Sequence, residues 1–532
     1  MYLILIKILY TFIAMKKEFL LEQKRTPYID AYQEYLSEKN TSFDVPGHHQ
    51  GNIKTEFDRI FPHAVYKADV NCPRGLDNIL HPSGCIKESE ELFAKACHAS
   101  KARFLVNGST SGNLIMLMAT LKAHQKIILP RNVHKSVING LILSGAVPVF
   151  VMPVIDKQTE IVNQIQYKEW KKAIDQNPDA RAIFIINPTY FGATCNLKKI
   201  TEYAHSKGMV VLCDEAHGAH FYFSKHLPIS AMDAGCDMST LSVHKTGGSL
   251  TQSSVLLINT DKVSQYEINK AYNLITTTSP SSILLASLDG ARKYLVFHGS
   301  RRIWKCIKLA REAIDEINKI KGFKAHGKEY FTKGLAFDYD ETKIVVELDN
   351  LSITGFECYK ILKDEYRIQI ELAETYVLLL LYTVGTRNKD SLKIIEALKD
   401  ISRRFYKESI TYPDHHFVTE IPDLKVRPRV AFHGPLKIVD LKDALNKISK
   451  EMIMIYPPGI PLIIPGEVFS SNIINQIEYY KNTGVSVFSD FEGTNQVSII
   501  DEDDPDYNEI IKKNWFLQGF INFGGLYENY NY

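Results

Sequence analysis

A lysine stands just after an apolar, strand-like run in the segment Ser242-Val-His-Lys245-Thr-Gly-Gly. When such a lysine is desolvated its pKa falls, and its neutral amine can attack a carbonyl carbon. The glycines that follow allow the backbone to approach a bound ligand closely. Because most strand-end lysines are solvated caps, Lys245 is a candidate nucleophile only if other segments supply the rest of a site.

A second apolar run ends in Cys213-Asp214-Glu215-Ala216-His217-Gly218-Ala219-His220. Two carboxylates and two histidines so close in sequence could bind a metal ion. However, a strand places Asp214 and Glu215 on opposite faces, and no further ligand stands at a typical spacing. The interpretation we favour is a buried carboxylate that pairs with a protonated heterocyclic nitrogen, with no metal in the site.

The third segment, Asn107-Gly-Ser-Thr-Ser-Gly-Asn113, is typical of a turn between a strand and a helix. Free backbone N–H groups, the positive end of the helix dipole and the hydroxyls of Ser109 and Thr110 could hold a phosphate. A plain Ser/Thr helix cap is the alternative interpretation. The segment is neither a Walker loop nor a dinucleotide-binding G-x-G-x-x-G motif.

Together the three segments form a coherent set. A phosphate cradle, an aspartate and a strand-end lysine follow one another along the chain, and these are the parts needed to hold pyridoxal phosphate. The phosphate would lie on the helix N-terminus, the ring nitrogen would face Asp214, and the aldehyde would be carried by Lys245 as a Schiff base.

The elements that must position these residues are short apolar strands alternating with helices, such as those expected at 111–124 and 197–207. This pattern predicts an α/β fold whose mainly parallel sheet is covered on both faces, with the ligand site outside the strand ends. A smaller α+β stretch follows at 316–408, with strands expected at 342–348 and 367–372. The strands expected in the main sheet are 102–106, 126–129, 147–151, 182–186, 209–213, 238–243 and 254–258.

Composition narrows the class of protein. With 63 Lys and Arg against 61 Asp and Glu, the net charge is +2. So balanced a charge does not indicate binding to nucleic acid or to a charged membrane surface. A hydrophobic fraction of 45% is that of a globular chain. The 8 cysteines form no C-x-x-C pair, which favours free thiols and a cytoplasmic location. We expect residues 1–14 to be an upstream extension, or else a short amphipathic docking helix.

Beyond the three segments, the chain resembles the Orn/Lys/Arg decarboxylases, a family of fold type I pyridoxal-phosphate enzymes. The resemblance covers roughly residues 25 to 500 and is closest to the short bacterial arginine decarboxylases. The motifs that carry it include Val45-Pro-Gly-His-His-Gln-Gly51, Pro130-Arg-Asn-Val-His-Lys135, Asn187-Pro-Thr-Tyr-Phe-Gly192, Asp214-Glu-Ala-His-Gly218, Ser242-Val-His-Lys245 and Pro465-Gly-Glu467.

The resemblance implies a role for each site residue. Lys245 would bind the cofactor covalently, Asp214 would pair with the pyridine nitrogen, His134 would stack on the ring, and His217 would orient groups or handle protons. The other cofactor contacts would come from Ser109, Thr110, Ala216, Ser242 and His244, with Thr278 and Ser279 reaching the phosphate from a neighbouring subunit. Candidates for binding the substrate are Glu467, Glu371 and His48.

The implied activity is decarboxylation of a basic amino acid, with arginine to agmatine in polyamine synthesis preferred. Lysine to cadaverine is the next alternative, followed by ornithine, by another reaction such as transamination, and by an inactive regulatory homologue. We expect a homodimer or larger homo-oligomer with interfacial sites. The expected divisions are an N-terminal oligomerisation segment (1–45), a cofactor-binding large domain (46–315), a small α+β domain (316–410) and a C-terminal family domain (411–532).

Overall fold

The computed structural model describes residues 14–71, 74–156, 159, 161–410, 420–456, 460–482, 486–491 and 495–507. The expectation for residues 1–14 therefore falls almost entirely outside the described residues. None of the helices in the described ranges is long and apolar enough to cross a membrane.

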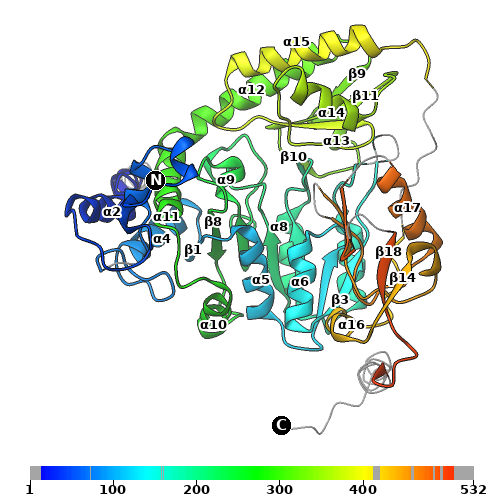
Figure 1. The fold of residues 1–532 in the computed structure, drawn as a ribbon, viewed down its shortest axis with the longest axis horizontal. Coiled ribbons are helices and arrows are strands. Elements are labelled where there is room, and N and C mark those ends of the chain that lie inside the picture. Colours follow the sequence, from blue (N-terminus) through cyan, green and yellow to red (C-terminus); the bar gives the residue numbers. More distant parts are fainter. Residues whose placement is uncertain are drawn as a thin grey trace, which may run out of the picture.

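A seven-stranded sheet forms the centre of the molecule (Figure 1). Its strands are β1 (Lys101–Leu105), β2 (Lys126–Pro130), β3 (Val147–Val151), β4 (Ala182–Ile186), β6 (Val210–Asp214), β7 (Met238–Leu241) and β8 (Ser254–Ile258). Their order is β1-β8-β7-β6-β4-β2-β3, parallel from β7 to β3, with β8 antiparallel to both of its neighbours. The expected mainly parallel sheet is confirmed, although β7 ends two residues earlier than the sequence suggested.

Helices cover both faces of this sheet. The chain moves from β1 to β2 to β3 in one direction and returns to β4 and β6 in the other. Because such crossovers are right-handed, α5 and α6 lie on one face and α7 and α8 on the other. The helices of this part are α2 (Pro27–Ser37), α3 (Ala64–Ala68), α4 (Cys85–Ala96), α5 (Gly108–Thr120), α6 (Lys135–Ser144), α7 (Tyr167–Gln176), α8 (Leu197–Ser206), α9 (Val243–Thr246), α10 (Gln265–Ile275) and α11 (Ser282–Tyr294).

A small antiparallel sheet lies at the top of Figure 1, beside helices α12 (Ser300–Ile317), α13 (Lys328–Phe331), α14 (Gly355–Asp364) and α15 (Asn388–Phe405). Its order is β12-β13-β11-β9. The strands are β9 (Phe323–His326), β11 (Lys343–Leu348), β12 (Leu372–Ala373) and β13 (Val377–Leu381), and a separate pair joins β5 (Ala193–Thr194) to β10 (Asp338–Tyr339).

One strand expected in this small sheet is wrong. Residues 367–370 have no strand conformation, and of the expected 367–372 run only Leu372 enters β12. Arg367 has a left-handed backbone with φ 54°, which ends the turn after α14 instead of extending into a ladder. The strand beside β11 is instead β13, whose continuous apolar run Val377–Leu381 lies between β11 and β12.

The C-terminal part packs against the edge of the main sheet at the right of Figure 1. Ile464 from this part is buried within the main hydrophobic core. Its elements are α16 (Pro428–His433), β14 (Leu436–Asp440), β15 (Ile453–Tyr456), β16 (Ile460–Ile463), α17 (Ser471–Asn482), β17 (Ser486–Phe488) and β18 (Gln496–Ile500).

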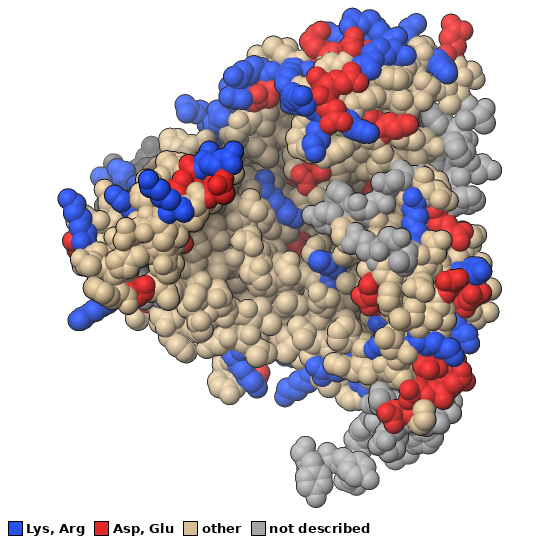
Figure 2. Space-filling model, viewed as in Figure 1, with Lys and Arg blue, Asp and Glu red and all other residues tan. Residues whose placement is uncertain are grey.

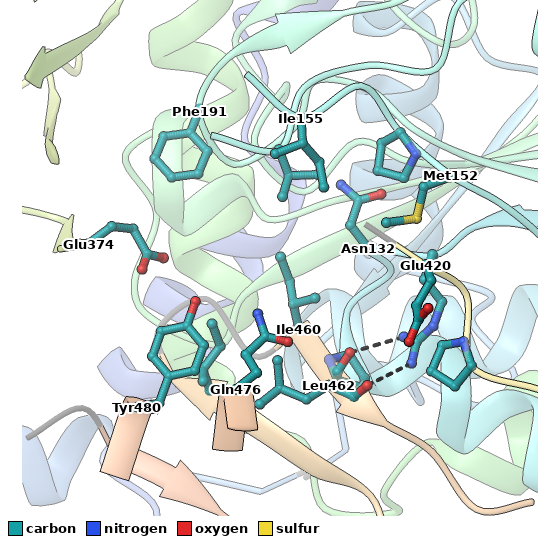
Figure 3. A pocket seen from close by; sticks show the side chains of 16 residues that line it. Asn132, Met152, Ile155, Phe191, Glu374, Glu420, Ile460, Leu462, Gln476 and Tyr480 are labelled. Atoms are coloured by element: carbon teal, nitrogen blue, oxygen red, sulfur yellow. Dashed lines mark hydrogen bonds between the residues drawn. The ribbon is translucent and has the colours of Figure 1, made fainter. Parts of the chain in front are cut away.

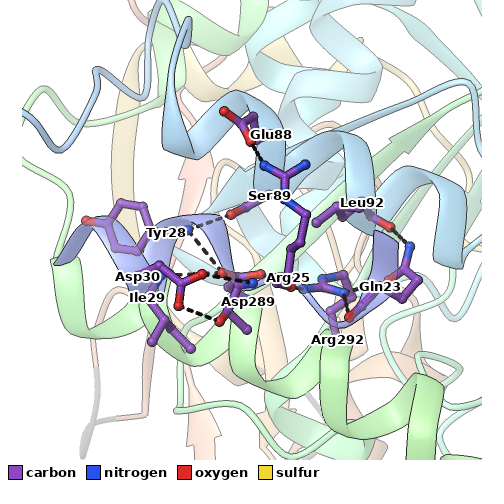
Figure 4. A network of polar contacts seen from close by, with 11 residues as sticks. Gln23, Arg25, Tyr28, Ile29, Asp30, Glu88, Ser89, Leu92, Asp289 and Arg292 are labelled. Atoms are coloured by element: carbon purple, nitrogen blue, oxygen red, sulfur yellow. Dashed lines mark hydrogen bonds and ion pairs between the residues drawn. The ribbon is translucent and has the colours of Figure 1, made fainter. Parts of the chain in front are cut away.

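The segment that leads into α2 is held to the main body by a buried ion pair (Figure 4). Arg292 of α11 is fully buried; its guanidinium pairs with Asp289 at 2.9 Å and donates to the backbone and side-chain oxygens of Gln23 at 2.9 and 2.6 Å. Asp289 in turn accepts the backbone N–H of Tyr28 at 3.1 Å. The ion pair therefore supplies hydrogen-bond partners to the chain that enters α2, in addition to neutralising its own two charges.

We expect Arg292→Met to lower the free energy of unfolding by about 3–5 kcal/mol, because it leaves the Asp289 carboxylate buried and unpaired. Urea unfolding at one protein concentration measures the loss. The matched control is Arg311→Met, which removes a guanidinium that is 53% exposed and pairs with Glu341. That surface change should cost no more than about 1 kcal/mol. Equal losses in the two variants would contradict a special role for the buried pair.

Candidate active site

A cavity of about 480 Å³ opens where the parallel strands end. The carboxyl ends of β4, β6 and β7 are in register, with Ile186 beside Asp214 and Asp214 beside Thr240. This alignment brings together loops that are far apart in sequence, as expected for the ligand site of such a sheet. Ten residues singled out from the sequence line the cavity: Ser109, Thr110, His134, Asp214, Ala216, His217, Ser242, His244, Lys245 and Glu371.

Lys245 and His217 are in direct contact inside this cavity. Lys245 lies in the single turn of α9, and its Nζ is 3.0 Å from Nε2 of His217. Burial lowers the pKa of the Lys245 ammonium group, opposed by the carboxylates of Asp214 and Glu371. Burial also lowers the pKa of His217 well below its usual value, and the positive charge of Lys245 adds to this effect. His217 is therefore a neutral imidazole within hydrogen-bonding distance of the lysine amine.

Asp214 is fixed in place by two donors. Its Oδ2 accepts from Nδ2 of Asn113 at 2.8 Å, and its Oδ1 accepts from the backbone N–H of Ala216 at 3.0 Å. The carboxylate belongs to the last residue of β6 and lines the cavity. It can hold a proton on a basic nitrogen that faces it.

Glu215 points to the opposite side of the strand, as the alternation of strand side chains requires. It is fully buried and accepts hydrogen bonds from Tyr222 at 2.6 Å and from the backbone N–H of Ala231 at 2.8 Å. Burial raises its pKa to about 8. Within the part of the chain that the structure describes, no group of three or more His, Cys, Asp and Glu could hold a metal ion.

The N-terminus of α5 opens into the other end of the cavity. Gly108 has φ +69°, a left-handed conformation that glycine adopts without strain, and it begins the helix. A methyl group at Gly112 would lie 2.1 Å from Oγ1 of Thr240, so the helix packs tightly against β7. This close approach brings the hydroxyl of Ser109 within 2.6 Å of that of Ser242. Backbone N–H groups and hydroxyls thus converge where an anion can bind.

His134 forms one wall of the cavity and caps α6. Its Nδ1 accepts the backbone N–H of Ser136 at 3.2 Å. Burial lowers the pKa of His134 to about 4. The imidazole is neutral and held by the helix start, which suits it for packing against a flat ring.

Four of the predicted site residues are not among those that line this cavity. Glu467 is fully buried; its carboxylate pairs with Arg131 at 2.8 Å, and burial raises its pKa to about 7. His48 lies 3.2 Å from Asp69. Thr278 and Ser279 are exposed between α10 and α11. Among the described lining residues the carboxylates are those of Asp214 and Glu371.

Tyr190 is a lining residue to which the sequence assigned no role. Its hydroxyl donates to Oε1 of Glu371 at 2.5 Å, and its ring centroid is 4.5 Å from that of His217. It lies in the Asn187-Pro-Thr-Tyr-Phe-Gly192 motif, which was the available signal. Asn113, the partner of Asp214, was likewise quoted in a motif without a role.

A smaller chamber of about 100 Å³ adjoins the cavity (Figure 3). The two share Asn132, Val162, Phe191 and Ile460. In the close view Tyr480 of α17 and Glu374 lie on one side, and the aliphatic side chains of Ile460 and Leu462 point between them and Met152. The C-terminal part of the chain thus supplies a wall beside the cavity.

Comparison with known proteins decides the family. The model of the Orn/Lys/Arg decarboxylase major domain matches residues 26–390, and that of the C-terminal domain matches residues 415–493. The chain belongs to the Orn/Lys/Arg decarboxylase family. The resemblance expected from the motifs is confirmed.

The sequences of individual family members align with most of this chain. It is 38% identical to the arginine decarboxylase of Bacillus subtilis, over 88% of this chain and 96% of that one. It is 39% identical to the arginine decarboxylase of Halalkalibacterium halodurans, over 87% and 95%. The constitutive lysine decarboxylase of Escherichia coli has the same fold, with TM-score 0.75 and 20% identity over 90% of this chain and 82% of that one. The expected fold type I architecture is confirmed.

Proposed function

We propose that the protein decarboxylates arginine to agmatine and CO2 with pyridoxal phosphate as cofactor. The observation that carries this proposal is the single cavity in which a desolvated Lys245, the buried carboxylate of Asp214 and the N-terminus of α5 meet. These donors fit the cofactor's aldehyde, ring nitrogen and phosphate respectively. The choice of arginine is supported by the relatives at 38–39% identity that bear that name.

When bound, pyridoxal phosphate supplies an electron sink for the pair left on Cα as CO2 departs. The chain does the rest. The amides and hydroxyls at the start of α5 would bind the phosphate, Asp214 would keep a proton on the ring nitrogen, and His134 would pack on the ring. A proton must replace the carboxylate on Cα. Lys245 would hold and deliver it, and His217, 3.0 Å from the lysine amine, would orient that amine.

The test of the function is CO2 release from arginine, lysine and ornithine, each supplied separately to the purified protein with pyridoxal phosphate. Arginine should give the highest kcat/KM. Faster release from lysine would move the substrate assignment to that amino acid, and consumption of an α-keto acid without CO2 would favour transamination. Absence of all these reactions would indicate an inactive homologue.

We expect Glu371→Gln to raise KM for arginine by about ten- to a hundredfold, because the amide no longer offers a charged acceptor to the guanidinium. Steady-state kinetics with arginine measures the change, and kcat should fall much less. Glu374→Gln is the matched control, since Glu374 is three residues away and lines the adjoining chamber instead. A larger KM effect at Glu374 than at Glu371 would assign the distal cation to that chamber.

We propose a homodimer as the active unit, in the cytoplasm. The seven described cysteines are all free, which suits a reducing compartment. Figure 2 shows a broad central surface with few charged side chains, while Lys, Arg, Asp and Glu gather over the small sheet, over the C-terminal part and at the upper left of the view. Large apolar side chains are also exposed between residues 43 and 61: Phe43 is 95% and Ile60 is 76% exposed. Such a concentration is typical of a contact surface.

The double change Phe43→Asp with Ile60→Asp should therefore convert dimers to monomers and abolish activity, if Thr278 and Ser279 complete the site of the neighbouring subunit. Light scattering with chromatography measures the mass. Leu392→Asp is the control: Leu392 is 55% exposed but lies on α15, beside the small sheet. A wild-type protein that is monomeric and fully active would contradict the dimer proposal.

A further inference from the structure

Lys343 is a buried lysine that the proposed chemistry does not use. It begins β11, and only 1% of it is exposed. Its Nζ donates to the carbonyl oxygen of Tyr190 at 2.7 Å and lies 3.5 Å from that of Thr189. The hydrogen-bond partners that the structure gives this ammonium group are these two backbone carbonyl oxygens. Burial lowers its pKa to about 8, opposed by Asp340 and Glu371. Burying an ammonium group costs folding free energy, which indicates that Lys343 has a role other than stabilising the fold.

The contact joins two parts of the fold that are far apart in sequence. Lys343 comes from the small sheet, whereas Tyr190 follows β4 of the main sheet. Gly192, at the end of the same loop, has φ +99°, and a methyl group there would lie 3.1 Å from Cδ of Lys343. The backbone N–H of Asp340 donates to the carbonyl of Gly192 at 2.9 Å. The loop is therefore fixed around the lysine stem from both sides.

Tyr190, whose backbone carbonyl accepts a hydrogen bond from Lys343, also contacts Glu371, the acid proposed to bind the substrate. The hydroxyl of Tyr190 donates to Glu371 at 2.5 Å, and Glu371 is anchored to the small sheet through its backbone N–H, 3.2 Å from the carbonyl of Leu379. One lysine thus ties the loop that carries Tyr190 to the same sheet that carries Glu371. A shift of either would change where the Glu371 carboxylate points.

We propose that Lys343 is a positioning residue for substrate specificity, which fixes Tyr190 so that the Tyr190–Glu371 pair presents its carboxylate to the distal cation of the substrate. This inference rests on the proposed function, since it takes Glu371 as the group that receives that cation. Lys343 acts through Tyr190 and does not itself touch the reacting atoms.

The test is a double-mutant cycle between Lys343→Met and Glu371→Gln. We expect Lys343→Met to raise KM for arginine at least tenfold with kcat changed less than threefold, and to weaken agmatine binding in calorimetry by a similar factor. In the Glu371→Gln background Lys343→Met should have no further effect on KM, because the carboxylate that Lys343 positions is already absent. The control is Lys324→Met, which removes a half-exposed lysine of the adjacent strand β9 and should leave KM unchanged.

Independent, multiplying effects of the two changes would overturn the proposal, as would a fall in kcat at constant KM. If Lys343→Met does not fold, Tyr190→Phe provides the second test, because it removes only the hydroxyl that reaches Glu371. It should reproduce the rise in KM, and an unchanged KM would overturn the proposal. Failure of the wild type to release CO2 from arginine would instead count against the proposed function.

Discussion

Replacing Lys245 with alanine should reduce decarboxylation on the order of 10⁴-fold or more, since it removes the group that would bind the cofactor covalently. The structure gives the physical reason. The amine lies in a buried cavity where its pKa is lowered, and the neutral imidazole of His217 is 3.0 Å away. Turnover of arginine and the absorbance of the cofactor-bound lysine should be lost together.

Two further variants separate this role from a general need for positive charge. Lys245→Arg should be as inactive as alanine, because a guanidinium is not nucleophilic at accessible pH. Lys343→Met removes the other buried lysine near the cavity and should leave the cofactor attached. After borohydride reduction, mass spectrometry should place the pyridoxyl group on the peptide that contains Lys245. An adduct on any other lysine of the active wild type would contradict the assignment.

The residues that carry the proposed chemistry could be predicted because they stand where buried strands end. Asp214 closes β6 and Ser242 follows β7, and parallel strands bring their carboxyl ends to one edge of the sheet. The turn before α5 was recognisable from the hydroxyl-bearing residues that follow its glycine. The local sequence was therefore enough to predict which strand or helix carries each of these side chains and at which end of it the side chain stands.

Residues that depend on distant partners could not be predicted in this way. Lys343 begins an apolar strand, so its sequence alone is typical of a solvated strand end. Its burial arises from a loop 153 residues away in the chain. Glu467 was a candidate for binding the substrate, but its carboxylate pairs with Arg131, which is 336 residues away. Pairing across such separations depends on how the small sheet and the C-terminal part dock, and no local pattern specifies that.

Asp214→Asn should lower kcat by about two to four orders of magnitude while the cofactor remains bound to Lys245. Asparagine keeps the size of the side chain and can still accept the backbone N–H of Ala216, which donates to Oδ1 at 3.0 Å. It loses the negative charge that stabilises a proton on a facing ring nitrogen, and its amide nitrogen can no longer accept the hydrogen bond that Nδ2 of Asn113 donates to Oδ2 of Asp214. Without that proton the ring is a poor acceptor for the electrons released with CO2. Cofactor content by absorbance and kcat with arginine, measured on the same sample, test the prediction.

Glu215→Gln is the matched control for this last change. It alters the adjacent carboxyl group of the same chain segment, on the face turned away from the cavity. Burial raises the pKa of Glu215 to about 8, so the amide changes the charge at this position less than it does at Asp214. Its kcat should stay within the same order of magnitude as that of the wild type. If Asp214→Asn kept most of its activity, or if both variants fell equally, the loss could not be ascribed to a carboxylate facing the ring nitrogen, and Asp214 would be only a structural residue at the end of β6.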